Sequence, residues 1–309
     1  MNDHTCKSTE QAASELRRWI SQLYDAGPAK DLILSPGSLI GLQRLFASLG
    51  VRRVTLSNAE YYGRIHFPEQ QVRIVRPDLV TAVTSRTTQP QTDAIIMSLV
   101  SWKGDVLPVG SVFGQIRKAF GSNSPLLIAD YSHAGAIGFT SVRALDADIV
   151  FGDVGNWIAP SAWEKKLRFL WFRTRRLRAA SRRSFRPFFS ALDDQSENFY
   201  ADWIRPRDVI SLNEWMEKHR PSREVLASRH AKNLELKSQL ESLLGPSANS
   251  PQSAIWWRST RLSSHRTTKV LARLEKLVNV WRVPGRGIRV LCRAEQCDSR
   301  VCSSLRSIR

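Results

Sequence analysis

Polar residues that could do chemistry follow several short apolar runs of the chain. Ser35-Pro36-Gly37-Ser38 follows one run and opens a helix, which would present free backbone N–H groups and a positive dipole end to an anion. Asp130 ends the run LLIAD, and His133 follows three residues later, so that a carboxylate and an imidazole suited to proton transfer stand close together in sequence. Ordinary structure offers an alternative for each: a helix N-cap, a loop carboxylate and a hydrogen-bonded histidine.

The elements that must position these residues alternate between strand and helix, which favours an α/β fold with a mostly parallel central sheet and crossover helices. Ligands of such sheets bind at the carboxyl ends of the strands, where the polar residues stand. Strands are predicted at Asp31–Leu34, Arg53–Ser57, Gln71–Val75, Ala94–Val100, Leu126–Ala129 and Ile149–Gly152. Helices are predicted at Thr9–Tyr24, Ser38–Leu49 and Val112–Phe120.

The last third of the chain has a different order of elements, typical of a small α+β domain. Helices are predicted at Leu212–His219, Arg223–Leu244 and Thr267–Leu277, and strands at Ala254–Ser259, Val278–Val283 and Ile288–Cys292. We therefore divide the chain into an N-terminal helix (1–30), a large domain (31–205), a small C-terminal domain (206–295) and a tail (296–309).

Five segments follow one another along the chain: LILSPGSLIGL, NAEYYG, LLIADYSHAGAIG, ALDADIVFGDVGNWIAP and GRGIRVLCRA. In order and spacing they resemble conserved blocks of class V aminotransferases, cysteine desulfurases and kynureninases, which are fold type I enzymes dependent on pyridoxal phosphate (PLP). The resemblance covers about residues 30–295 and implies the PLP-transferase fold for the large domain.

The resemblance implies a role for residues in the first three blocks. The turn at Ser35, Gly37 and Ser38 would hold the cofactor phosphate. Tyr61 would stack on the pyridine ring in place of the family's histidine, because stacking needs only a flat aromatic surface. Asp130 would pair with the protonated ring nitrogen and keep the ring an electron sink.

Two further residues match family positions that contact the ring or the substrate. His133 falls where the family places Gln or His against the ring hydroxyl. Arg289 matches the arginine that binds the substrate α-carboxylate, which its planar guanidinium suits. A solvent-facing strand arginine is the alternative for Arg289.

The fourth block departs from the family. Its pattern has a lysine that binds the cofactor covalently, and Asn156 stands at that position, with Gly155 in place of a histidine and Asp153 in place of a serine. An amide lacks the lysine amine's nucleophilicity, and a carboxylate repels a nearby phosphate. We therefore predict a degenerate member of the family with no cofactor, PLP binding being lost or non-covalent. No metal site is predicted, because Cys292, Cys297 and Cys302 lack the two-residue spacing of a zinc site and have no histidine near them.

Three functions follow from this sequence. The first is a cofactor-independent biosynthetic enzyme of lyase or cyclase type, which expels sulfate or phosphate from an anionic amino-acid-derived substrate and uses His133, Asp153 or Asn156 in catalysis. The second is a non-catalytic subunit of a hetero-oligomer. The third is a nucleic-acid binder, which ranks last because no nucleic-acid motif is present.

The net charge of the chain indicates which binding partners to expect. The chain has 309 residues and a formal net charge of +18, and the segment 163–187 is dense in arginine and lysine, with Glu164 as its acid. We interpret 163–187 as a basic helix on which Trp163, Phe169, Trp171 and Phe172 are exposed as partner contacts. We expect an anionic small-molecule substrate, a dimer that includes a different subunit, no nucleic acid, no membrane, and a cytoplasmic location.

Overall fold

The structure is a computed structural model that describes residues 8–35, 38–60, 67–75, 92–154, 157–158, 167–185, 206–258, 280–283 and 287–292. The chain divides into two compact units. Unit 1 comprises Met1–Leu99, Pro108–Ser132 and Thr140–Pro221, and unit 2 comprises Val100–Leu107, His133–Phe139 and Ser222–Arg309. The domain boundaries predicted from the sequence stay a prediction.

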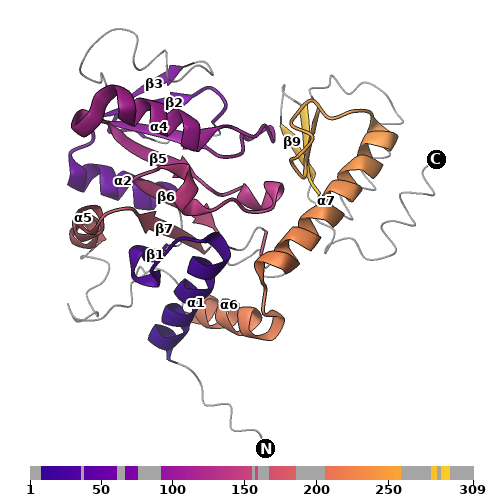
Figure 1. Ribbon diagram of the computed structural model, residues 1–309, viewed down its shortest axis with the longest axis horizontal. Helices are drawn as coiled ribbons and strands as arrows, with labels where there is room; N and C mark the ends of the chain where they lie inside the picture. The colour runs from indigo at the N-terminus through magenta and orange to yellow at the C-terminus, as the bar shows by residue number, and fades with distance from the viewer. Residues whose placement is uncertain are drawn as a thin grey trace, which may run out of the picture. The chain divides into compact units, whose positions relative to one another are not determined.

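Unit 1 is built on a seven-stranded sheet in the order β1-β7-β6-β5-β4-β2-β3 (Figure 1). The strands are β1 (Leu32–Ser35), β2 (Arg53–Ser57), β3 (Gln71–Val75), β4 (Ala94–Ser98), β5 (Leu126–Asp130), β6 (Ile149–Asp153) and β7 (Arg168–Phe172). β7 runs antiparallel to both of its neighbours, and the other pairs are parallel. The predicted α/β class with a mostly parallel sheet is confirmed.

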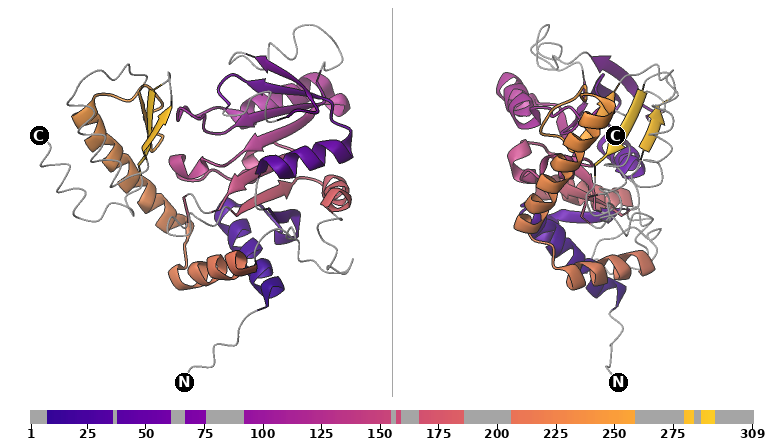
Figure 2. Two further views of the ribbon diagram at one scale, coloured as in Figure 1. Left: turned by 180° about the vertical axis from the view of Figure 1, so that it is seen from behind. Right: turned by 90° about the vertical axis from the view of Figure 1, so that its right-hand side faces the viewer.

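Helices cover both faces of this sheet, which is why its central strands β4 and β6 are buried along their whole length and apolar up to their last residues, Ser98 and Asp153. α4 (Val109–Phe120) lies on one face, and α2 (Ser38–Leu49) and α5 (Arg175–Phe185) pack together on the other (Figures 1 and 2). α1 (Thr9–Tyr24) packs against α6 (Pro206–His219) beside β1. Short 3-10 turns complete the unit at Ala29–Asp31, Gly121–Asn123 and Val142–Leu145.

Unit 2 consists of the long helix α7 (Arg223–Leu244) and an antiparallel sheet in the order β8-β10-β9. The strands are β8 (Ile255–Arg258), β9 (Val280–Val283) and β10 (Gly287–Leu291). α7 packs on β8 and on the 3-10 turn Ala134–Ile137. The predicted helix Thr267–Leu277 lies outside the described residues. In the described part of the chain, no helix is long and apolar enough to cross a membrane.

The segment 163–187 is not one helix, and this prediction was wrong. Residues Arg168–Phe172 form β7 inside the sheet, and the basic helix begins only at Arg175. Phe169, Trp171 and Phe172, which we expected to be exposed partner contacts, are buried at 0%, 8% and 1% exposure. Two sheet neighbours and two covering layers bury this strand, so these aromatic residues stabilise the core. Trp163 lies outside the described residues.

Glycine is required at position 152, where β6 passes under an aromatic cluster. A Cβ atom there would lie 2.6 Å from the ring of Phe169 and 3.3 Å from the Cβ atom of Tyr131. Tyr24 completes the cluster, with its ring centroid 5.1 Å from each of the other two. Its hydroxyl donates to the backbone carbonyl of Asp153 at 3.1 Å, so α1 is fixed to the carboxyl end of β6.

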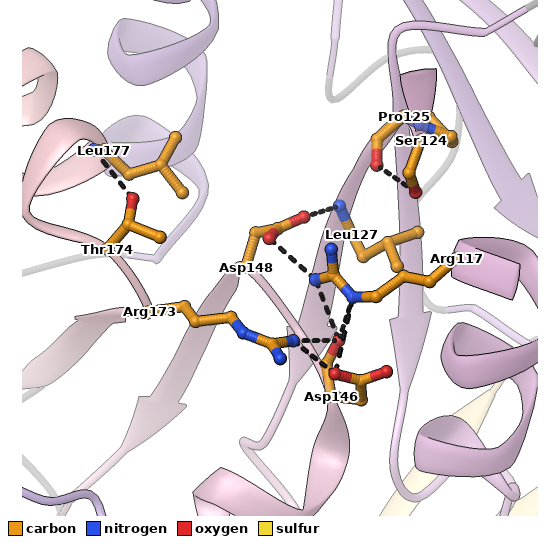
Figure 3. A network of polar contacts seen from close by, with 9 residues as sticks. All are labelled: Arg117, Ser124, Pro125, Leu127, Asp146, Asp148, Arg173, Thr174 and Leu177. Carbon is orange, nitrogen blue, oxygen red and sulfur yellow. Dashed lines mark hydrogen bonds and ion pairs between the residues drawn. The ribbon is translucent and has the colours of Figure 1, made fainter. Parts of the chain in front are cut away.

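Asp148 connects several elements at the amino ends of the strands, the end of the sheet opposite to Asp153 (Figure 3). One carboxylate oxygen accepts from the backbone N–H of Leu127 at 2.9 Å and the other from Nη2 of Arg117 at 2.7 Å, joining β5, α4 and the start of β6. Arg117 and Arg173 both donate to Asp146 beside it. This aspartate, which also belongs to the fourth family block, therefore has a structural role.

Replacing Asp148 by alanine should destabilise unit 1 by about 1–3 kcal/mol, because a buried N–H and a guanidinium lose their charged acceptor. Urea unfolding followed by circular dichroism measures this loss. Arg143→Ala is the matched control, since its ion pair with Asp25 is exposed at both partners and should contribute about 0–1 kcal/mol. Equal loss in the two variants would contradict the structural role of Asp148.

Candidate functional site

The carboxyl ends of the strands bring a set of buried polar residues to one edge of the sheet of unit 1. Ser98 ends β4, Asp130 ends the central strand β5 and Asp153 ends β6, with exposures of 4%, 7% and 3%. Ser35 ends β1 and is 2% exposed. The register places Ser98 opposite Asp130, and both Ser35 and Asp153 opposite Arg168 of β7. Three residues predicted from the sequence, Ser35, Asp130 and Asp153, therefore lie along the same edge.

Asp130 presents a carboxylate at the centre of this edge. Its Oδ1 accepts from the backbone N–H of Ser132 at 2.8 Å, which fixes the side chain over the end of β5. Its backbone carbonyl accepts from Leu99, the residue after β4. A carboxylate held this way in a low-dielectric place favours a cationic N–H donor as its ligand.

Glu60 is a second buried carboxyl group at this edge. It lies three residues beyond the end of β2, and one oxygen, Oε1, accepts from the N–H of Ser98 at 2.8 Å and from Oγ of Ser57 at 3.1 Å. The hydroxyl of Ser98 donates to Oε2. Burial, together with the negative charge of Asp130, raises the pKa of Glu60 from 4.5 to about 7, against the hydrogen bonds from Ser98 and Ser57, which lower it. The group therefore titrates near neutral pH.

Asp153 forms an ion pair with Arg168, which stands opposite it in β7. The side chain of Asp153 is 1% exposed and that of Arg168 is 22% exposed, so the carboxylate is buried and the guanidinium is partly buried. We predicted that Asp153 would repel a phosphate group. That electrostatic argument loses its force here, because Arg168 supplies the compensating positive charge.

The other predicted site residues fall elsewhere. Gly37, Tyr61 and Asn156 lie outside the described residues. Ser38 is the first residue of α2, directly after the turn that follows Ser35. The structure does not describe its side chain.

Two predicted residues belong to unit 2. His133 is half-buried and precedes the 3-10 turn Ala134–Ile137, with its carbonyl accepting from the N–H of Ala136. Arg289 stands in β10 between Trp257 of β8 and Trp281 of β9, at a position whose side chain the structure does not describe. The roles predicted for both remain predictions.

Sequence reasoning missed Glu60, Ser98 and Arg168. Glu60 was visible beside Tyr61 in the block NAEYYG, but the neighbouring aromatic residue drew the assignment. A glutamate just beyond a buried strand, with a serine three residues before it, was the available signal. Arg168 was hidden because the segment around it was interpreted as helix.

No family model and no curated protein matches the chain. Solved structures do match it. Ureidoglycine–glyoxylate aminotransferase from Bacillus subtilis superposes with a TM-score of 0.70 at 9% identity, over 99% of this chain and 87% of that one. The PLP-dependent cyclase OrfR gives a TM-score of 0.59 at 16% identity, over 99% and 85%. A lysine-to-alanine variant of C-DES, with glycine covalently linked to the PLP cofactor, gives 0.67 at 11% identity, over 97% and 86%.

These likenesses establish the fold: the chain has the PLP-transferase fold along almost its entire length. Its structural neighbours are PLP-dependent enzymes of the class V aminotransferase and cysteine desulfurase type. The prediction that the protein uses no cofactor is contradicted by them, since they are PLP-dependent and point to PLP rather than to no cofactor. Of the two grounds for that prediction, the residue at the lysine position and the charge of Asp153, the second fails because Arg168 neutralises Asp153.

Proposed function

We propose that this chain is an enzyme that binds a PLP-type cofactor at the carboxyl edge of the unit 1 sheet and acts on an anionic, amino-acid-derived substrate. The observation that carries the proposal is Asp130, a buried carboxylate at the end of the central strand of a PLP-transferase fold. The reaction class we propose is an elimination or cyclisation that expels an anionic group. The likeness to a PLP-dependent cyclase supports this class.

The residues at the edge suit the parts of such a cofactor. Asp130 would hold the protonated ring nitrogen, and this pairing is what makes the ring an acceptor of electron density from a bound substrate. The turn after Ser35 leads into the N-terminus of α2, a place where backbone N–H groups favour a phosphate. Arg168 stands opposite both Ser35 and Asp153, and because it neutralises Asp153, that carboxylate does not repel a phosphate on this side of the edge.

We further propose that the cofactor is held without a covalent bond to the protein. Asn156 aligns with the family lysine, and an amide supplies no amine for that bond. The C-DES variant supports this step, because a protein with the same fold carries PLP after a lysine-to-alanine change. Binding then rests on the ring nitrogen, the phosphate and packing.

The test of this proposal is the fate of PLP added to the purified protein. We expect PLP to bind, to be removed by gel filtration, and to leave no adduct on the protein after borohydride reduction, as judged by intact-mass spectrometry. Reduction should leave an adduct only on a protein that binds PLP through an amine. A stoichiometric adduct that peptide mapping assigns to Lys165 or Lys166 would refute the non-covalent mode, and failure of PLP to bind would refute the proposal as a whole.

A further inference from the structure

A surface dense in arginine and lysine lies at the amino ends of the strands of unit 1, opposite to the candidate site. It is formed by the turn before β1, the last turn of α4, the turn before β6, and the stretch from the end of β7 into α5. Because β7 runs antiparallel to β6, its last residue and the start of α5 lie at this end. We call the group the amino-edge basic surface, and its basic residues are Lys30, Arg117, Lys118, Arg143, Arg173, Arg175, Arg176 and Arg178.

Side-chain contacts connect these segments to one another. Arg117 of α4 and Arg173, which follows β7, both form ion pairs with Asp146, and Figure 3 shows the two guanidinium groups at that aspartate. Arg178 of α5 donates to the backbone carbonyl of Lys30 at 2.8 Å. The basic residues therefore belong to one continuous part of unit 1, although they come from distant parts of the sequence.

The carboxylates beside this surface already bind arginine side chains. Asp146 binds two of them, and the other pairs are Asp25 with Arg143, Asp31 with Arg178 and Asp148 with Arg117. In the part of the chain that the structure describes, the exposed basic residues of the surface that form no ion pair are Lys30, Lys118, Arg175 and Arg176. The surface therefore has an excess of positive charge, in agreement with the formal net charge of +18 of the whole chain.

Apolar groups contribute little to this surface. Among the described residues, the large apolar side chains that are exposed are Ile74 and Val225, and neither belongs to the amino-edge basic surface. A protein partner usually needs an apolar or aromatic centre in the interface, and a helix lying on a membrane inserts an apolar face. Charge is what this surface offers to a partner, which favours a polyanion.

We propose that the amino-edge basic surface binds the phosphate backbone of double-stranded nucleic acid without reading its sequence. The guanidinium group of arginine matches the geometry of phosphate oxygens, and neutralising phosphates releases condensed counterions, which supplies affinity. A single strand is bound largely by stacking its bases on aromatic side chains, and the described part of this surface exposes none. Phosphate binding of this kind needs no sequence motif, so the proposal departs from the expectation of no nucleic acid, which rested on the missing motif.

The first turn of α5 is fixed in a way that suits this role. The hydroxyl oxygen of Thr174 accepts from the backbone N–H of Leu177 at 3.2 Å, and Arg178 is hydrogen-bonded to the turn before β1. Arg175 and Arg176 therefore extend from an ordered turn into solvent. Because this turn and the candidate site lie at opposite ends of the strands, the proposal is independent of the proposed function.

The experiment measures the binding of short fluorescent duplexes of DNA and of RNA by anisotropy over a range of salt concentrations. Both duplexes should bind whatever their sequence, and the logarithm of the association constant should fall linearly with the logarithm of the salt concentration. Arg175→Gln/Arg176→Gln should reduce the magnitude of that slope by about two, because each phosphate contact contributes about one. Arg175→Lys/Arg176→Lys keeps the charge and should keep most of the slope. Both residues are exposed and glutamine and lysine favour helix, so circular dichroism should show both variants folded.

Arg73→Gln/Arg223→Gln is the matched control, because it removes the same charge from exposed positions on β3 and α7. This control should leave the slope nearly unchanged. If it reduces the slope as much as Arg175→Gln/Arg176→Gln, the net charge of the chain rather than this surface binds the duplex, and the inference fails. It also fails if the wild type binds neither duplex at low salt. Tighter binding of poly-L-glutamate or of vesicles of anionic phospholipid than of the duplexes would overturn it in favour of an acidic protein or a membrane.

Discussion

Replacing Asp130 by asparagine is expected to weaken the binding of deoxypyridoxine phosphate, the PLP analogue with a methyl group in place of the aldehyde, roughly 10- to 100-fold. The reason is that a hydrogen bond to a charged group contributes about 1.5–3 kcal/mol. The amide keeps an oxygen for the N–H of Ser132, so the end of β5 should stay in place. What is lost is the negative charge that favours a protonated ring nitrogen. Fluorescence or calorimetric titration measures the change.

A matched control separates this local effect from a general change in charge. Asp146 lies at the opposite edge of the same sheet, where it pairs with Arg117 and Arg173 (Figure 3). Asp146→Asn removes the same charge and should leave the affinity within about twofold, because Asp146 lies at the other end of the strands, where Arg117 and Arg173 compensate its charge. Unchanged affinity in Asp130→Asn would mean that the ring nitrogen is bound elsewhere.

Arg168→Met should be the most destabilising single change in the candidate site, with a loss of about 3–5 kcal/mol. Methionine retains much of the side-chain volume but leaves the carboxylate of Asp153 buried at 1% exposure without its cation. Removing one partner of a buried ion pair leaves the other charge buried and uncompensated, whereas removing both charges does not. Denaturant unfolding at neutral pH provides the measurement.

The double variant Asp153→Asn/Arg168→Met tests the cause. It should recover most of the stability, because no charge is left buried. Arg53→Ala is the surface counterpart: its partner Asp93 is 27% exposed and Arg53 itself is 48% exposed, so that ion pair should contribute little. If the double variant is as unstable as Arg168→Met, packing by the arginine stem rather than charge is responsible.

Most of the sheet could be predicted from the sequence, because its parallel strands are short apolar runs with polar residues at their carboxyl ends. The strands β2 and β3 were predicted at their observed bounds, and β6 differs by one residue, Asp153. Buried parallel strands such as β2 and β6 give a strong local signal, since both faces are apolar, whereas β3 is largely exposed.

The strand β7 was predicted as helix for a physical reason. Its buried residues, Phe169 to Phe172, are flanked by Arg168 and Arg173, and the dense arginines beyond them gave the whole segment a helical, exposed interpretation. What identifies the strand is its pairing with β6 and with β1, which lies far away in the sequence. Local patterns do not contain that information.

The candidate site was predictable only in part for the same reason. Asp130 follows a recognisable strand, so its place at the edge could be deduced. The ion pair of Asp153 with Arg168, and the contacts of Glu60 with Ser98, depend on registers between strands separated by many residues. The prediction of no cofactor was wrong partly for this reason, because the charge of Asp153 was considered without its ion pair to Arg168.

The most direct test of a PLP-type site at Asp130 is a crystal structure of the protein saturated with deoxypyridoxine phosphate. We expect the ring nitrogen to lie within hydrogen-bonding distance of the Asp130 carboxylate, with the phosphate near the turn that follows Ser35. A ligand bound away from the carboxyl edge of the sheet, or an edge without ligand at saturating concentration, would contradict the proposal.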